Sequence, residues 1–466
     1  MKDHDLLTQQ IQNEMVAWLK GQSCATDENS RSSHVMRAKE YKKKSPRVSL
    51  SKLNQIVKIE ENAIWVEPYV TQEELAKATL PLGKIPPVIA EFKKITVGGA
   101  IMGSSLESSS HRFGQFNDPC LEYELLLGDS SIVKASPHEH KDLFYAVSGS
   151  FGSLALLTMA KIPLIRVKPY VAVVSLRYKN LDDYFKALKK LCHEKDRPNY
   201  IEGLIFAKDD FRIITGTFTD QVKGIFYDQK SSASEWYHQY VYKNDAFTMR
   251  IEDYLFRYDR GAFWMGTYAL WTSLLARFLF ENTLFDPLVK PFKEYPEGKY
   301  NQLKFPPYVF RKLAGWSMDS YDLYKRLHAK KEGWFKKHFV IQDFYIPEEN
   351  VEKMVEYTLE QNKIFPLWIC PCKGTETEQI LSPHQGEKLF FDVGIYGWPY
   401  EAMSGDMAAA DLEKKTYELS GRKMFYSYNF LSTEEMERLY PLDRFNSIRS
   451  AYKAEVFPHF LEKLYS

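Results

Sequence analysis

The chain has 466 residues and a net charge of +1, from 62 basic and 61 acidic side chains. Charges this evenly balanced provide no positive electrostatic potential that would attract nucleic acid. The chain is longer than a domain with a single hydrophobic core usually is, so two domains are expected. The 30 Tyr, 30 Phe and 9 Trp are consistent with a wide apolar cavity in a large enzyme, although core packing alone would account for most of them.

The N-terminal part of the chain is polar. Residues 1–20 are charged and contain only short apolar steps, so they predict neither a signal peptide nor a membrane anchor. We therefore expect a cytoplasmic protein. Residues 23–37 follow without a single glycine, and we interpret His34 within them as an ordinary loop histidine.

Residues 96–114, TVGGAIMGSSLESSSHRFG, are rich in glycine and serine and follow an apolar, strand-like stretch. Gly98, Gly99 and Gly103 lack a Cβ, so they can adopt positive φ and turn peptide N–H groups toward an anion such as a pyrophosphate. The spacing matches neither the Rossmann fingerprint nor a Walker loop. A glycine-rich hairpin or loop without a ligand would have the same composition.

The next segment, residues 122–162, predicts a strand, a Gly-Asp turn, a second strand, a short acidic helix and a glycine-bearing loop that enters a further strand. Beyond residue 168, apolar strand-like runs alternate with amphipathic helices. In Leu181–His193 the apolar residues recur at helical spacing. No internal repeat interrupts this pattern.

Residues 262–280, AFWMGTYALWTSLLARFLF, are apolar over nearly the length of a membrane span but include Arg277 and several hydroxyl side chains. Two interpretations stay open: a buried helix, or an interfacial pair of helices that makes a peripheral membrane contact. The five cysteines form no zinc-type pattern, so no metal is predicted and reduced thiols are expected. Cys370 and Cys372, with one residue between them, are poorly placed for a disulfide.

The segments at 96–114 and 122–162 together resemble the PCMH-type FAD-binding domain of the vanillyl-alcohol oxidase superfamily. Within it, the sequence is most similar to the delta-24 sterol reductase family, through ESSSHRFG at 107–114 and DLFYAV at 142–147. The similarity covers nearly the whole chain. Further matching motifs are IEGLIF at 201–206, TGTFTD at 215–220, YLFRYDRGAFW at 254–264, VIQDFYIP at 340–347, FPLWICP at 365–371 and LFFDVGIYGWP at 389–399.

The resemblance implies a two-domain α+β fold: a PCMH-type FAD domain at 1–168 and an α+β substrate (cap) domain at 169–466, with a C-terminal segment returning toward the flavin. It implies non-covalent FAD, NADPH as electron donor and reduction of a sterol side-chain double bond. A covalent flavin at His34 is the alternative, since some superfamily members carry one in this region. FAD contacts are implied for Thr96, Val97, Gly98, Gly99, Ile101, Gly103, Ser108, Ser109, Ser110, His111, Gly114, Gly149 and Gly152.

Hydride transfer to an isolated alkene needs a proton donor for the second carbon. The candidates are His111, Tyr396, Tyr426 and Tyr428, although His111 would serve equally as a cofactor contact and the tyrosines as strand residues with bonded hydroxyls. Asp343 and Asp392 lie in apolar runs, where they would need a partner. Two other functions stay open: an FAD oxidase or dehydrogenase of an alcohol or sugar, and a flavin-free lipid-binding protein.

Overall fold

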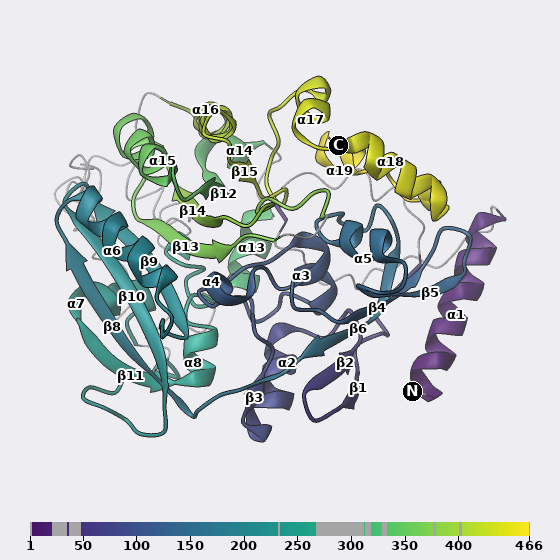
Figure 1. The fold of residues 1–466 in the computed structure, drawn as a ribbon, viewed down its shortest axis with the longest axis horizontal. Coiled ribbons are helices and arrows are strands. Elements are labelled where there is room, and N and C mark those ends of the chain that lie inside the picture. The colour runs from purple at the N-terminus through teal and green to yellow at the C-terminus, as the bar shows by residue number, and fades with distance from the viewer. Residues whose placement is uncertain are drawn as a thin grey trace, which may run out of the picture.

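The computed structural model describes residues 2–20, 35–36, 48–231, 234–266, 312, 318–328, 333–375, 379–399 and 403–465. His34, Cys24 and residues 267–280 lie outside these ranges. The described residues contain both helices and sheets, in agreement with the expected α+β class (Figure 1). Among them, no helix is long and apolar enough to cross a membrane.

A five-stranded sheet with strand order β1-β2-β6-β4-β5 forms the first part of the described chain. Its strands are β1 (Ile56–Ile59), β2 (Ala63–Val66), β4 (Glu122–Leu126), β5 (Ile132–Ala135) and β6 (Leu156–Pro163). The hairpin β4–β5 turns at Gly128 and Asp129, and α5 (Lys141–Val147) precedes β6, so the elements predicted for 122–162 are confirmed. A two-stranded ribbon, β3 (Lys84–Ile85) with β7 (Ile165–Arg166), lies at its side.

An eight-stranded sheet with order β11-β8-β10-β9-β13-β14-β12-β15 forms the second part. The strands are β8 (Tyr170–Tyr178), β9 (Tyr200–Ala207), β10 (Asp210–Thr219), β11 (Ala246–Arg250), β12 (Val340–Pro347), β13 (Leu367–Lys373), β14 (Leu389–Gly397) and β15 (Arg422–Lys423). The chain passes from one sheet to the other between β7 and β8. All the pairings are antiparallel.

Helices cover the outer face of the large sheet. α6 (Leu181–His193), α15 (Val351–Tyr357) and α16 (Gly405–Glu418) pack apolar side chains such as Phe185, Met354 and Leu412 on alternate residues of the strands. The prediction of a helix at 181–193 is confirmed, and Asn180 caps its start by accepting a hydrogen bond from the backbone of Asp183. With this face covered, the opposite face is turned toward the first sheet, and α4 (Ser110–Phe113) contacts β13 there (Figure 1).

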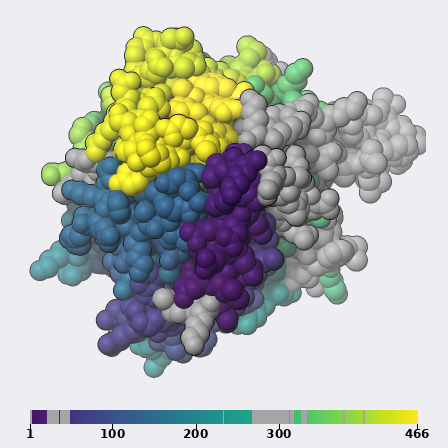
Figure 2. All heavy atoms as spheres, turned by 90° about the vertical axis from the view of Figure 1, so that its right-hand side faces the viewer, coloured from purple at the N-terminus to yellow at the C-terminus, as the bar shows by residue number. Residues whose placement is uncertain are grey.

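Further helices lie around and between the two sheets. They are α2 (Gln72–Thr79), α3 (Val97–Gly103), α7 (Tyr237–Lys243), α8 (Ile251–Leu255), α13 (Ser320–His328) and α14 (Trp334–His338), followed by α17 (Thr433–Leu439), α18 (Leu442–Ala451) and α19 (Phe460–Tyr465). The last three return to the first sheet. There α18 contacts α5, and the Lys463 ammonium donates to the carbonyl of Phe151 at 2.8 Å. Figure 2 shows these helices, in yellow, directly above the blue segment that carries α5.

The N-terminal helix α1 (Lys2–Leu19) lies along the side of the first sheet (Figure 2). Its His4 is buried between two acidic side chains, with Nδ1 2.7 Å from Glu67 and Nε2 3.0 Å from Glu124. Only a protonated imidazole donates from both nitrogens. Burial lowers the pKa of His4, but the hydrogen bonds and charges of Glu124 and Glu67 outweigh it and raise the pKa to about 9.

This arrangement predicts that α1 docks less firmly at alkaline pH. Because the folded pKa lies above the unfolded value of 6.5, the stabilisation is complete below pH 6.5, declines as the pH rises, and is lost above about pH 9. By linkage it amounts to roughly 3 kcal/mol. Replacing His4 with Gln is expected to lower the midpoint of thermal unfolding at pH 6 and to change it little at pH 9.5. The exposed His138 provides the control, because H138Q should follow wild type at every pH.

Candidate active site

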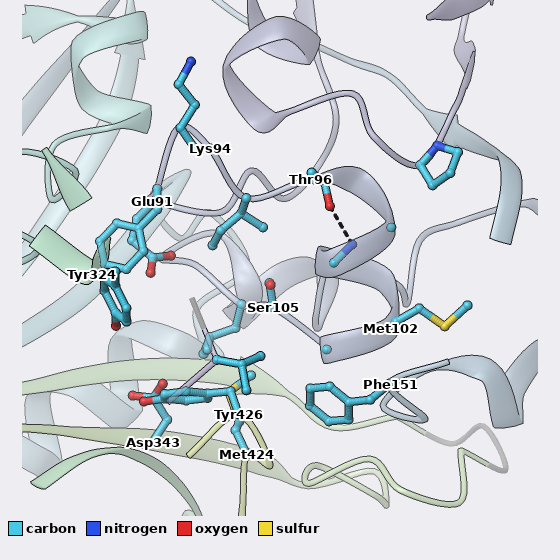
Figure 3. Close-up of a pocket in the computed structure, with 18 of the residues that line it drawn as sticks. Glu91, Lys94, Thr96, Met102, Ser105, Phe151, Tyr324, Asp343, Met424 and Tyr426 are labelled. Atoms are coloured by element: carbon cyan, nitrogen blue, oxygen red, sulfur yellow. Dashed lines mark hydrogen bonds between the residues drawn. The ribbon is translucent and has the colours of Figure 1, made fainter. Parts of the chain in front are cut away.

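A cavity of about 470 Å³ lies between the first sheet's loops and the inner face of the large sheet. Its size is that of a small-molecule or cofactor site. Figure 3 shows α3 on one side of it and the segment carrying Met424 and Tyr426 on the other. Most of the wall is apolar, from Phe92, Leu106, Phe151, Phe263, Met265, Ile341, Trp368 and Met424. The polar lining is concentrated in Glu91, Lys94, Thr96, Ser105, Asp343, Tyr396 and Tyr426.

The glycine-rich segment forms one wall, but in a different conformation from the one expected. Thr96 caps the start of α3 by accepting the N–H of Gly99, and the N–H of Gly98 donates to the carbonyl of Pro68. Gly98, Gly99 and Gly103 therefore do not take positive φ, and the first two have amides that are already bonded. The prediction of a positive-φ anion loop is wrong because a threonine N-cap converts the segment into a helix.

The glycines are important here because they have no Cβ, which lets the helix pack closely and leaves its backbone uncovered. A Cβ on Gly98 would lie 2.9 Å from that of Pro68, so the helix could not rest at its present depth. Gly99 is exposed and lines the cavity, and a Cβ there would approach only the Thr96 hydroxyl, at 3.1 Å. The α3 backbone consequently forms the cavity surface directly, which a flat ligand can approach closely.

The serines at 108–110 and His111 lie behind this wall and do not line the cavity. Their side chains bond within the protein: Ser109 donates to the Pro87 carbonyl, and His111 lies 2.9 Å from the carbonyl of Ser108 and 3.1 Å from that of Pro198. Burial lowers the pKa of His111 to about 4. Tyr428 also lies outside the cavity lining, where its carbonyl accepts from the Lys423 ammonium.

The predicted site residues thus separate into two groups. The structure brings Thr96, Gly98, Gly99, Gly103, Gly152, Tyr396 and Tyr426 to the cavity. Val97, Ile101, Ser108, Ser109, Ser110, His111, Gly114, Gly149 and Tyr428 are not part of its lining. Of these, Val97 and Ile101 pack into the core, and Gly114 and Gly149 take positive φ in tight turns, as does Gly152 in the lining.

A carboxylate with two tyrosines forms the floor of the cavity. Asp343 on β12 accepts a hydrogen bond from the hydroxyl of Tyr396 on β14, and a second from Tyr426 in the C-terminal segment. Gly394, directly across the strand pair from Asp343, makes this possible. A Cβ on Gly394 would lie 2.5 Å from the Tyr396 hydroxyl oxygen and 3.0 Å from Oδ1 of Asp343.

Two further acids surround this floor. Asp392 lies two residues before Gly394 on β14, and Glu91 lines the cavity opposite, where Figure 3 shows it beside Tyr324. Burial raises the pKa of Asp343 to about 6 and the pKa of Glu91 to about 8. Burial, together with the neighbouring charge of Asp343, raises the pKa of Asp392 well above its usual value. The cavity can therefore hold protons near neutral pH.

A buried ion cluster supports the cavity wall from behind. The guanidinium of Arg257 donates to Glu107 at 2.7 Å and to Glu202 at 2.8 Å and 3.0 Å. All three side chains are buried. Glu202 also accepts the indole N–H of Trp368, which lines the cavity. The cluster connects the segment after α3, the strand β9 and the cavity wall.

Sequence reasoning missed Glu91, Gly394 and the role of Arg257. Glu91 follows an apolar stretch that ends at Ala90, and a lone carboxylate next to such a stretch is a signal that could have been used. Gly394 could have been noticed as a glycine inside a strand, a position that often allows a close approach. Nothing in the sequence alone pairs Arg257 with acids 55 and 150 residues away.

Comparison with known proteins agrees with this geometry. Residues 29–136 match the family model of an FAD binding domain. The Delta(24)-sterol reductase of Macaca fascicularis is 28% identical over 440 residues, which cover 92% of this chain and 79% of the relative. The chain is a homologue of the Delta(24)-sterol reductases. The same protein of Arabidopsis thaliana is 25% identical, over 90% of this chain and 76% of the relative.

This homologue is an FAD-dependent oxidoreductase, as the matched domain and the relatives together indicate. Cytokinin dehydrogenase 8 of Oryza sativa subsp. indica is also similar, at 28% identity, but over only 31% of this chain and 26% of its own length. The sterol reductases, in contrast, match through the FAD-binding residues and the large sheet alike. The match to the reductases therefore extends well beyond the residues of the FAD-binding family model.

The residues at the α3 side of the cavity fit FAD. The backbone at Gly98, Gly99 and Gly103 lines the cavity with no side chain over it, and Ser105 lines the same wall. The Ser104 hydroxyl, next to this wall, is buried and has no hydrogen-bond partner among the described residues. A buried hydroxyl in this condition is stabilised by a polar ligand atom. These residues would hold the cofactor, and bound FAD would supply a hydride.

Occupation of the cavity by FAD can be tested at Gly99. Leucine at this position would extend into the cavity while its Cβ meets only Thr96, so G99L is expected to fold and to lose most of its flavin. The ratio of flavin absorbance to protein absorbance measures the loss. Lys77 on α2 is exposed and outside the cavity, and K77L should keep the full flavin content. Equal flavin content in both variants would contradict this placement of FAD.

Proposed function

We propose that this enzyme reduces the side-chain (delta-24) double bond of a sterol, with FAD held non-covalently and NADPH as the electron donor. The observation that carries the proposal is the apolar cavity itself, in which the bare backbone of α3 faces a floor of proton-bearing side chains. The relatives that match over the whole of this arrangement are named for that reaction. An aromatic and aliphatic wall suits a sterol better than a sugar.

In this proposal three groups of residues have three different roles. Phe92, Phe263 and Trp368 bind the hydrocarbon and exclude water. The glycines of α3 and Ser105 place the cofactor against the substrate, which brings the reacting atoms together. Tyr396 gives a proton to one alkene carbon while the hydride arrives at the other, and Tyr426 helps to hold the same acid floor.

The assignment of domains and of a cellular location rests on the same resemblance. We propose an FAD domain at residues 1–168 and a substrate domain at 169–466, whose C-terminal segment contributes Met424 and Tyr426 to the cavity. The passage between the sheets at β7 and β8 supports this division. A cytoplasmic protein with a peripheral membrane contact at 262–280 would suit a sterol substrate, but residues 267–280 lie outside the described structure.

Product analysis tests the proposal. The purified protein, supplied with FAD, NADPH and a sterol carrying the delta-24 double bond, is expected to yield the sterol with two additional hydrogens, detected by mass spectrometry. Deuterium supplied on the transferable position of the nicotinamide should reach the product through the flavin, diluted by exchange with water. Absence of a reduced sterol, together with reduction of the flavin by an alcohol, would favour an alcohol oxidase or dehydrogenase instead.

A further inference from the structure

Asp392 is the most unusual polar side chain of the large sheet. It is fully buried, no other side chain or backbone N–H of the described residues donates to its carboxyl oxygens, and the group that faces it is the carboxyl of Asp343. An ionised carboxylate in this position would be strongly destabilising, because burial removes its hydration and no donor replaces it. Asp392 is therefore expected to be a neutral acid, with one O–H that it can donate.

The sheet register places an acceptor for that proton next to it. Asp343 lies directly opposite Gly394, and Asp392 and Tyr396 occupy the two diagonal positions on the same face of β14. Diagonal neighbours lie within reach of each other's side chains. Since Gly394 has no side chain, Asp343 can contact both: it accepts from Tyr396 on one side and lies against Asp392 on the other.

We propose that Asp392 and Asp343 form a carboxyl pair that holds one proton and delivers it to Tyr396 for protonation of the substrate alkene. The proposal rests on the proposed function above and names the proton supply of that same site. Asp343, Tyr396 and Tyr426 line the cavity, whereas Asp392 is not part of its lining. In this scheme Tyr396 is the catalytic residue, and Asp392 acts through Asp343 as a positioning and proton-storing residue.

The scheme balances in atoms and electrons. One alkene carbon would form a C–H bond with the hydride supplied by FAD that NADPH has reduced, and that hydride brings its own electron pair. The π electrons of the alkene form the second C–H bond with the proton of Tyr396. The one proton of the pair moves from Asp392 to Asp343 and on to the Tyr396 oxygen, and a proton from solvent replaces it as it leaves, so the pair again holds one proton and the two carboxylates are not ionised together. With the shared proton on Asp343, the Tyr396 hydroxyl is free to point into the cavity.

Other titratable groups face the pair and set the pH at which it works. Glu91 approaches from the loop before α3, Tyr324 from α13 and Tyr426 from the C-terminal segment. From the sheet itself, Tyr345, Cys370 and Cys372 face it, each with a pKa raised by burial and by the neighbouring acid. None of these groups is cationic, so none of them provides a positive charge that would favour two ionised carboxylates.

Infrared spectroscopy tests whether the pair holds a proton, without any reaction. The FAD-loaded protein at pH 7 is expected to show a protonated carboxyl band that shifts on 13C-aspartate labelling and is absent in D392N. Asp411 provides the matched control: it accepts the hydroxyl of Tyr357 at 2.7 Å outside the cavity, and D411N should keep the band. A band that persists in D392N would overturn the proposal. If D392N does not fold, a wild type without a band that shifts on 13C-aspartate labelling would overturn it instead.

Stopped-flow kinetics tests whether that proton is used. D392N is expected to reoxidise its reduced flavin with the sterol alkene about 10- to 100-fold more slowly and to lose one limb of the pH profile. Reduction of the flavin by NADPH should be unchanged, and D411N should resemble wild type throughout. Unchanged reoxidation in D392N would refute the proton supply. A wild-type enzyme that no sterol alkene reoxidises would instead refute the proposed function, and the infrared result would still decide whether the pair holds a proton.

Discussion

Replacing Tyr396 with Phe is expected to slow the transfer from reduced flavin to the sterol alkene by about 10²- to 10³-fold, because the substitution removes the hydroxyl that would protonate the second alkene carbon. The ring would keep its packing on Phe263, whose centroid lies 5.0 Å away, so the cavity should keep its shape. Rapid mixing of the reduced enzyme with the sterol under anaerobic conditions measures the rate directly.

The control for this substitution is Tyr357→Phe, which removes a hydroxyl bonded to Asp411 on the outer helices. Y357F should transfer at the wild-type rate. Reduction by NADPH should be the same in both variants, because Tyr396 has no part in that half of the reaction. If Y396F reoxidises as fast as Y357F, another group supplies the proton.

Replacing Arg257 with Met is expected to cost about 3–5 kcal/mol of stability. Methionine preserves most of the side-chain volume, so the loss arises mainly from leaving Glu202 and Glu107 buried without their cation. The pKa of Glu107 is already raised, first by burial, and it would rise further without Arg257. Chemical denaturation followed by circular dichroism measures the change in midpoint.

Arg250 provides the comparison. It pairs with Asp228 and Asp253 at the partly exposed edge of the large sheet, where an ion pair contributes little. R250M should therefore lower the stability by at most about 1 kcal/mol. A similar effect of the two substitutions would show that the Arg257 cluster does not connect the two parts of the chain in the way described.

Local patterns in the sequence predicted local structure well. The Gly-Asp turn between two apolar runs predicted the hairpin β4–β5, and the helical spacing after Asn180 predicted α6 at its observed bounds. The glycines at 98 and 99 were misjudged because Thr96 was not considered as an N-cap. The Thr96 side chain accepts the backbone N–H of the residue three positions later. This N-cap hydrogen bond stabilises the start of a helix, even though two of its first residues are glycines.

The floor of the candidate site was predicted only in part. Tyr396 and Asp343 were recognised as polar residues in strand-like runs, and Tyr426 as part of the C-terminal segment. The contact between Asp343 and Tyr396 depends on the register of β12 against β14, across 53 residues of chain. A shift of one residue would direct Asp343 to the opposite face. Burial of His4 between Glu67 and Glu124 depends in the same way on the tertiary docking of α1. Such pairings are properties of the packed fold rather than of any sequence segment.

The most direct test of the central claim is the visible spectrum of the purified protein under anaerobic conditions, recorded first with NADPH and then with a delta-24 sterol. The account predicts that NADPH bleaches the flavin band and that the sterol restores it, with one sterol reduced for each flavin reoxidised. A flavin band that persists with NADPH, or a bleached band that the sterol does not restore, would contradict it.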